Sequence, residues 1–124
     1  MKKKILIVDD NEDLNKFVQR SYKDSYETLR AKSGAVAVGL TIMEVPDLIL
    51  MDLMTYKLNG LVVVSLIRKN PKTHSIPILA ITGGLSITIE DECSRIGCDD
   101  YLSKPFTPAE LSTRMTKLLK QDSA

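Results

Sequence analysis

The chain has little that would tie it to a membrane or to a nucleic acid. Its 124 residues contain no apolar run near the ~20 residues of a membrane span, and no signal-peptide pattern. Seventeen basic and sixteen acidic side chains leave a formal net charge of +1. No overall field therefore attracts nucleic acid or anionic lipid. We expect a chain that makes no direct contact with either.

Cysteine is scarce as well. The two cysteines, Cys93 and Cys98, form neither a CxxC motif nor a group with metal-ligand spacing. Two reduced thiols of this kind are typical of a cytosolic protein. We therefore expect a cytoplasmic location, with Cys93 packed in the core of a helix rather than serving as a sensor.

Short apolar runs alternate with segments of helical periodicity. The runs predict five strands, at Lys4–Asp9, Tyr26–Ala31, Leu48–Asp52, Ile76–Ile81 and Asp100–Leu102. Apolar residues recur three and four apart between them, and a last helix is expected from about Pro108 to Lys120. This alternation predicts a five-stranded parallel sheet with helices on both faces, because right-handed crossovers cover the sheet. No repeat or interdomain linker is visible, so we expect residues 1–124 to form a single domain.

The third expected strand ends in an acid. Its run Leu48–Met51 is apolar throughout, as in a strand buried on both faces of a parallel sheet. The next residue is Asp52, whose carboxylate costs free energy wherever water is scarce. Ligands of open α/β sheets bind outside the carboxyl ends of the strands. The polar residues expected at that edge are Asp9, Asp10, Asp52, Thr82 and, after the fifth strand, Lys104.

These residue types point to a cation and a phosphoryl group. If the third strand neighbours the first, three carboxylates meet, and their repulsion calls for a cation. Mg²⁺ takes one or two carboxylates, several waters and a phosphate oxygen. Thr82 and Lys104 are a suitable donor and counter-charge for such an anion, which makes Asp52 the reacting group. Taken alone, Asp9 and Asp10 would also suit the acidic first turn of a helix.

Four motifs in order carry a family resemblance: ILIVDDNED, LILMD with Gly60 eight residues after its acid, ILAITG and DDYLSKPF. Over essentially its whole length the chain resembles the receiver domains of bacterial two-component response regulators, the CheY-like family. The resemblance implies a doubly wound fold with strand order 2-1-3-4-5. It also implies that a histidine kinase or a histidine phosphotransfer protein donates a phosphoryl group to the chain. Such a domain is a signalling module rather than an enzyme, since it catalyses only its own phosphotransfer and autodephosphorylation.

The resemblance also implies a role for each acidic residue. Asp52 matches the aspartate that takes the phosphoryl group. Asp9 and Asp10 match the acidic pair that holds Mg²⁺, with Asp10 the more direct ligand. The backbone carbonyl of Met54 matches the third protein ligand of the metal. The expected metal site therefore consists of these four residues.

A second group matches the residues that respond to phosphorylation. Thr82 corresponds to the hydroxyl that closes on the phosphoryl oxygens, and Lys104 to the lysine that pairs with them. The Lys104–Pro105 bond corresponds to one that is usually cis, which would aim Lys104 into the pocket. Tyr101 matches the aromatic that turns inward when Thr82 moves, which shifts the population between two packings.

The surface expected to change is formed by the helix around Ile89–Ile96, the strand Asp100–Leu102 and the last helix. We expect it to bind an unidentified downstream protein or output domain, or to form a homodimer. Arg114 is placed to meet Asp99 or Asp100, within the domain or across a two-fold dimer.

Three other functions share part of this pattern. An FMN-binding flavodoxin needs a Ser/Thr/Gly-rich phosphate loop after the first strand, where this chain has DDNED. A haloacid-dehalogenase-type phosphatase needs a second Asp where this chain has Met54. A degenerate receiver that only binds partners is disfavoured by the intact acidic set. The chain departs from the family at Thr55-Tyr56, where Met-Pro is usual, and loss of that proline should free the loop.

Overall fold

The computed structural model describes residues 2–9, 12–22, 24–53, 60–83 and 87–120. Within these ranges the strands are β1 (Lys3–Val8), β2 (Tyr26–Ala31), β3 (Leu48–Asp52), β4 (Ile78–Thr82) and β5 (Asp100–Ser103). The helices are α1 (Asp13–Tyr22), α2 (Gly34–Glu44), α3 (Gly60–Lys69), α4 (Ile87–Ile96) and α5 (Pro108–Lys120). All strand pairs are parallel, in the order β2-β1-β3-β4-β5. The predicted fold class and strand order are confirmed.

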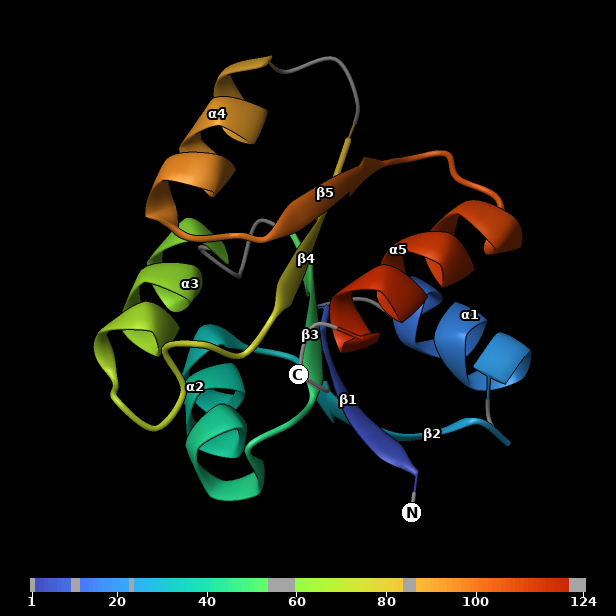
Figure 1. Cartoon of the computed structure of the whole chain (residues 1–124), viewed down its shortest axis with the longest axis horizontal. Coiled ribbons are helices and arrows are strands. Elements are labelled where there is room, and N and C mark those ends of the chain that lie inside the picture. Colours follow the sequence, from blue (N-terminus) through green and yellow to red (C-terminus); the bar gives the residue numbers. More distant parts are fainter. Residues whose placement is uncertain (1, 10–11, 23, 54–59, 84–86, 121–124) are drawn as a thin grey trace.

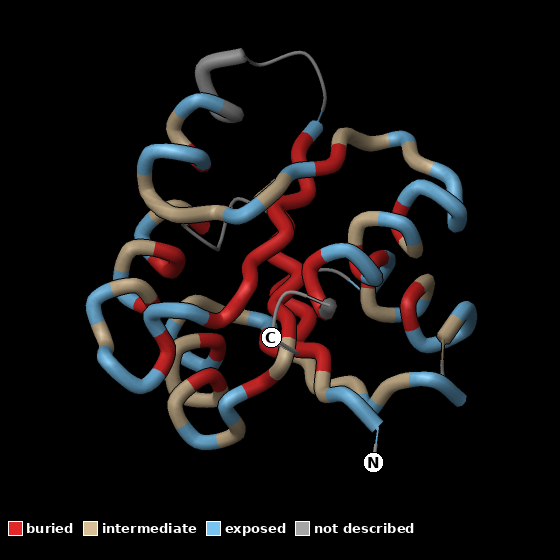
Figure 2. The backbone as a smooth tube through the Cα atoms, viewed as in Figure 1, coloured by how far each residue is buried: buried red, intermediate tan, exposed pale blue. Residues whose placement is uncertain are grey.

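Helices cover both faces of the sheet (Figure 1). α1 and α5 lie on one face, and α2, α3 and α4 lie on the other. The strands β3 and β4 are buried at every residue, which is why their sequences show no polar alternation. Figure 2 shows the buried residues gathered along the sheet and the exposed ones on the outer turns of the helices. None of the described helices is long and apolar enough to cross a membrane.

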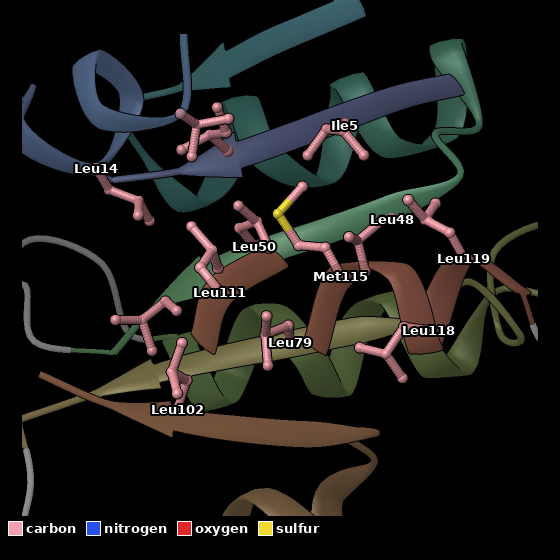
Figure 3. Close-up of a cluster of buried hydrophobic side chains, with 13 residues drawn as sticks. Ile5, Leu14, Leu48, Leu50, Leu79, Leu102, Leu111, Met115, Leu118 and Leu119 are labelled. Carbon is pink, nitrogen blue, oxygen red and sulfur yellow. The ribbon is translucent and has the colours of Figure 1, made fainter. Parts of the chain in front are cut away.

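Alternate residues of the strands supply two separate cores. The core beneath α1 and α5 (Figure 3) includes Ile5, Leu48, Leu50, Leu79, Leu111 and Met115. The core beneath α2 and α3 includes Leu6, Ile49, Met51, Val64 and Ile67. Since successive side chains of a strand point to opposite faces, a slip of one residue would exchange the two sets. Packing on both faces therefore specifies the register of the sheet.

Local sequence signals account for several helix ends. Thr107 and Glu110 form a capping box at the start of α5, in which each backbone N–H donates to the other's side chain at 3.1 Å. The hydroxyl of Ser33 accepts a hydrogen bond from the N–H of Val36 at the start of α2. α2 ends at Glu44 and is capped by Val45, whose φ of 44° is in the left-handed region and is unusual for a β-branched residue.

Some strand boundaries differ from the predicted ones. β1 is shifted by one residue, so that Asp9 follows the strand, and β5 extends one residue further, to Ser103. β4 begins at Ile78 rather than at Ile76. The N–H of Ile76 donates to the carbonyl of Thr73 in a turn, and the proline that follows has no N–H. The apolar run therefore starts two residues before the strand.

Arg68, near the end of α3, holds together the end of the molecule away from the carboxyl ends of the strands. Its guanidinium donates to the carbonyls of Gly97 at 2.8 Å, Ile76 at 2.8 Å and His74 at 3.0 Å, and it pairs with Asp99 at 2.8 Å. Gly97 has a φ of 127°, and a Cβ there would lie 2.9 Å from Cγ of Arg68. A glycine is thus required both by the backbone conformation and by the contact.

Replacing Arg68 by alanine should lower the free energy of unfolding by about 2–4 kcal/mol, because three carbonyls and a carboxylate lose a charged donor. Urea denaturation followed by circular dichroism measures this loss. Arg95→Ala, an exposed arginine in the last turn of α4, is the matched control and should change stability by less than about 0.5 kcal/mol. Equal losses in the two variants would contradict the anchoring role of Arg68.

Candidate functional site

The parallel register brings three polar side chains to one edge of the sheet. Val8 of β1 pairs with Met51 of β3, so Asp9 lies at the level of Asp52. Thr82 follows directly after the β4 residue that pairs with Asp52. All three side chains are buried, with residue exposures of 0% for both aspartates and 3% for the threonine. Two buried carboxylates at the ends of neighbouring strands are costly, which marks this edge as the candidate site.

Asp52 is in contact with a lysine from the connection after β5. The Nζ of Lys104 lies 3.0 Å from Oδ2 of Asp52. The aspartate side chain is 1% exposed and the lysine side chain 34% exposed, so the ammonium reaches from the surface toward a buried carboxylate. The N–H of Lys104 donates to the carbonyl of Thr82 at 2.8 Å, and the bond to Pro105 is cis, as the resemblance implied. The backbone that carries the cation is therefore attached to the end of β4.

The hydroxyl of Thr82 has a neighbour that the sequence did not single out. Its Oγ1 lies 3.3 Å from Oγ of Ser103, and either oxygen can be the donor. The two residues are direct partners in the pairing of β4 with β5. The sequence offered little indication of this contact, since only its place before Lys104 distinguishes Ser103 from other serines.

Asp9 has a structural contact besides its place in the site. Its Oδ2 accepts a hydrogen bond at 3.0 Å from the N–H of Leu14, in the first turn of α1, where a negative charge is favourable. Arg30 of β2, also not predicted, donates to the carbonyl of Asp9 at 3.4 Å and pairs with Glu12 at 3.4 Å. A hydrogen bond from Lys16, with the added charge of Arg30, lowers the pKa of the Glu12 carboxyl. The chain after β1 is thus held by cations from β2 and α1.

Two of the predicted metal ligands, Asp10 and Met54, lie outside the described residues. Within the ranges that the structure describes, no group of three or more His, Cys, Asp or Glu residues is arranged to hold a metal ion. The buried carboxylates of Asp9, just after β1, and of Asp52, at the end of the neighbouring β3, are hard oxygen donors, the type that Mg²⁺ prefers. These donors fit magnesium as part of a larger ligand set.

Tyr101 lies on β5, at the edge of the sheet, and Arg114 of α5 contacts this strand. Tyr101 is 36% exposed on β5, and its carbonyl accepts a hydrogen bond from Arg114 at 2.9 Å. Arg114 also pairs with Asp100 at 2.8 Å, whereas Asp99 pairs with Arg68. Of the two partners predicted for Arg114, the one that it contacts within this chain is Asp100.

An open depression of about 470 Å³ lies between the start of α1 and the chain that follows β5. It is lined by Asp13, Leu14, Phe17, Lys104, Pro105 and Phe106. The rings of Phe17 and Phe106 have centroids 5.5 Å apart and are tilted by 53°. Lys104 lines this depression and also contacts Asp52. The depression therefore adjoins the Lys104–Asp52 pair and offers an approach to it.

Comparison with known proteins agrees with this geometry. Residues 5–116 match the family model of the response regulator receiver domain. The chain is similar to the polar-differentiation response regulator DivK of Brucella ovis, with 34% identity over 108 residues that cover 86% of this chain and 88% of DivK. It is also similar to the solved structure of the chemotaxis protein CheY4 of Vibrio cholerae, with a TM-score of 0.88, 26% identity and coverage of 95% and 99% of the two chains.

A third similar structure contains a metal ion. It is the receiver domain of a sensor histidine kinase from Pseudomonas aeruginosa, in which a magnesium ion is coordinated in the active-site cleft. Its TM-score is 0.86 at 27% identity, and the match covers 97% of this chain and 99% of that one. Other curated relatives are longer, and the chain spans between 9% and 50% of the length of the first five. The match to the family model and to DivK shows that the chain belongs to the response regulator receiver domains, the phosphoacceptor modules of two-component signalling.

Proposed function

We propose that Asp52 is the phosphoacceptor of this receiver and that residues 1–124 form a single receiver domain. The observation that carries the proposal is the buried carboxylate of Asp52, 3.0 Å from Nζ of Lys104 at the carboxyl end of a strand in the middle of the sheet. A carboxylate is a suitable nucleophile for phosphorus. Phosphoryl transfer depends mainly on alignment and on cationic stabilisation. Asp52 is held by β3, and the backbone of Lys104 is hydrogen-bonded to the carbonyl of Thr82 at the end of β4.

In the proposed reaction, an oxygen of Asp52 attacks the phosphorus of a phosphohistidine. The new O–P bond forms as the P–N bond breaks, and the donor imidazole leaves. The ammonium of Lys104 pairs with the phosphoryl oxygens, and Thr82 turns its hydroxyl from Ser103 to donate to one of them. Asp9, Asp10, Asp52 and the carbonyl of Met54 would hold Mg²⁺, which when bound neutralises charge on the phosphoryl oxygens.

The phosphoryl donor is proposed to be a histidine kinase or a histidine phosphotransfer protein, in the cytoplasm. Its histidine must reach Asp52 from the open edge of the sheet. The depression beside Lys104 offers apolar contact there through Phe17 and Phe106, so a donor protein can dock next to the reacting carboxylate.

The proposed output surface comprises α4, β5 and α5, with Tyr101 as its switch residue. When Thr82 moves toward the phosphoryl group, Tyr101 can turn from its partly exposed position into the space that is vacated. This change shifts the population between two surfaces. A downstream protein, an output domain or a second copy would bind the phosphorylated form.

Asp52→Asn should abolish phosphorylation by acetyl phosphate in the presence of Mg²⁺, because the amide is not a nucleophile for phosphorus. The fold should persist with equal or higher stability, since one of several like charges is removed. Intact mass and thermal melts measure the two effects. Asp91→Asn, an exposed carboxylate of α4, should still be labelled. Full labelling of Asp52→Asn would refute the assignment.

Mg²⁺ should bind weakly, and Asp10→Asn should reduce its affinity more than Asp9→Asn does, because Asp10 is assigned the more direct contact. Titration calorimetry measures the affinities. Asp9→Asn should also lower the melting temperature, since the charge at the start of α1 is lost. Asp13→Asn, in the first turn of α1, is the control and should bind Mg²⁺ normally. The assignment of the two ligands is wrong if Asp9→Asn has the larger effect on affinity.

A further inference from the structure

Two hydroxyl side chains lie opposite each other at the end of the sheet that carries the candidate site. Thr82 is the last residue of β4 and Ser103 is the last residue of β5, and the two are direct partners in the parallel pairing. Their oxygens are 3.3 Å apart. The N–H of Lys104 donates to the carbonyl of Thr82 at 2.8 Å. Backbone pairing therefore holds the two hydroxyls within reach of each other.

The hydroxyl of Thr82 is turned away from the proposed phosphoacceptor. β4 lies between β3, which carries Asp52, and β5, which carries Ser103. A hydroxyl that is bonded to Ser103 is therefore turned toward β5 and not toward the strand of Asp52. To donate to a phosphoryl oxygen on Asp52, the Thr82 hydroxyl has to leave this position.

Burial makes this contact costly to break. Thr82 is 3% exposed, whereas Ser103 is partly exposed. Within the part of the chain that the structure describes, the hydroxyl of Ser103 is the one hydrogen-bond partner of the Thr82 hydroxyl. A buried hydroxyl that loses its partner costs free energy, because water does not replace the lost bond. The Thr82 hydroxyl should therefore stay with Ser103 until a stronger acceptor is present, and a charged phosphoryl oxygen is such an acceptor.

Ser103 also shares a face of the sheet with the proposed switch residue. Successive side chains of a strand point to opposite faces, and Leu102 belongs to the core beneath α1 and α5. Tyr101 and Ser103 therefore lie on the other face, which α2, α3 and α4 cover (Figure 1). Since Thr82 is the register partner of Ser103, the hydroxyl pair and the tyrosine ring lie on the same side of the sheet.

We propose that Ser103 is a positioning residue that holds the Thr82 hydroxyl in its unphosphorylated position, so that their hydrogen bond opposes the switch. The inference rests on the proposed function, in which Asp52 carries the phosphoryl group, and adds a residue that regulates it. A hydrogen bond that is present in only one of two states favours that state. The phosphoryl group therefore has to supply more binding free energy before the other state becomes populated.

Two other roles for the hydroxyl pair give different results when the Ser103 hydroxyl is removed. A cross-strand pair that only stabilises the sheet would make both forms of the domain less stable and leave the affinity for a phosphoryl mimic unchanged. A serine that supported the Thr82 hydroxyl in the phosphorylated form would weaken that affinity when removed. Only the proposed role predicts a tighter affinity, so the sign of the change separates the three.

Titration of the whole chain with beryllofluoride at a fixed Mg²⁺ concentration, followed by fluorine NMR, measures this affinity. Ser103→Ala should bind this phosphoryl mimic about three- to ten-fold more tightly, which is the effect expected of one neutral hydrogen bond. Ser103→Thr restores a hydroxyl and should return the affinity to within about two-fold of the parent. Ser75→Ala, at an exposed serine in the turn before β4, is the matched control and should bind as the parent does.

A double-mutant cycle shows whether Ser103 acts through Thr82. In a Thr82→Val background, which has no hydroxyl to hold, Ser103→Ala should change the affinity by less than about two-fold, with thermal melts reporting the fold of each variant. The proposal is overturned if Ser103→Ala binds as the parent does or more weakly, or if its gain persists in the Thr82→Val background. A parent that does not bind beryllofluoride at all would overturn the proposed function, and this inference with it.

Discussion

The parallel register of β1, β3 and β4 is the constraint on which the rest of the site depends. It places Asp9, Asp52 and Thr82 at one edge of the sheet. Both faces of these strands are packed, so a slip of one residue in β3 would send apolar side chains to the wrong core and turn Asp52 away from Lys104. Two hydrophobic cores therefore fix the position of a polar contact to which they contribute no atom.

The residues of the site also carry structural contacts. Asp9 supports the first turn of α1, and the backbone of Lys104 is bound to the carbonyl of Thr82. Burying a carboxylate such as Asp52 costs free energy that its lysine contact only partly offsets. The apolar packing on both faces of the sheet supplies the stability that this contact lacks.

The fold could be predicted because β3 and β4 are apolar throughout and the segments between strands have helical spacing. The meeting of Asp52 with Lys104 could be predicted too, because the carboxyl ends of parallel strands share one edge whatever the details of packing. Ser103, Arg30 and the contacts of Arg68 could not, since they depend on distances between segments far apart in the sequence. The start of β4 was misplaced because a turn takes the N–H of Ile76, a competition that hydrophobicity does not reveal.

The contacts of Arg68 have a consequence for how movement travels through the domain. The carbonyl of Gly97, just beyond the end of α4, is bound to α3 through this arginine, while the other end of α4 follows the strand that carries Thr82. A rearrangement that starts at the hydroxyl of Thr82 would thus meet a helix that is fastened at its far end. The helix would then rotate about that attachment, so its displacement would be greatest at the end of the helix near the site. An arginine remote from the chemistry would then determine the axis of the motion.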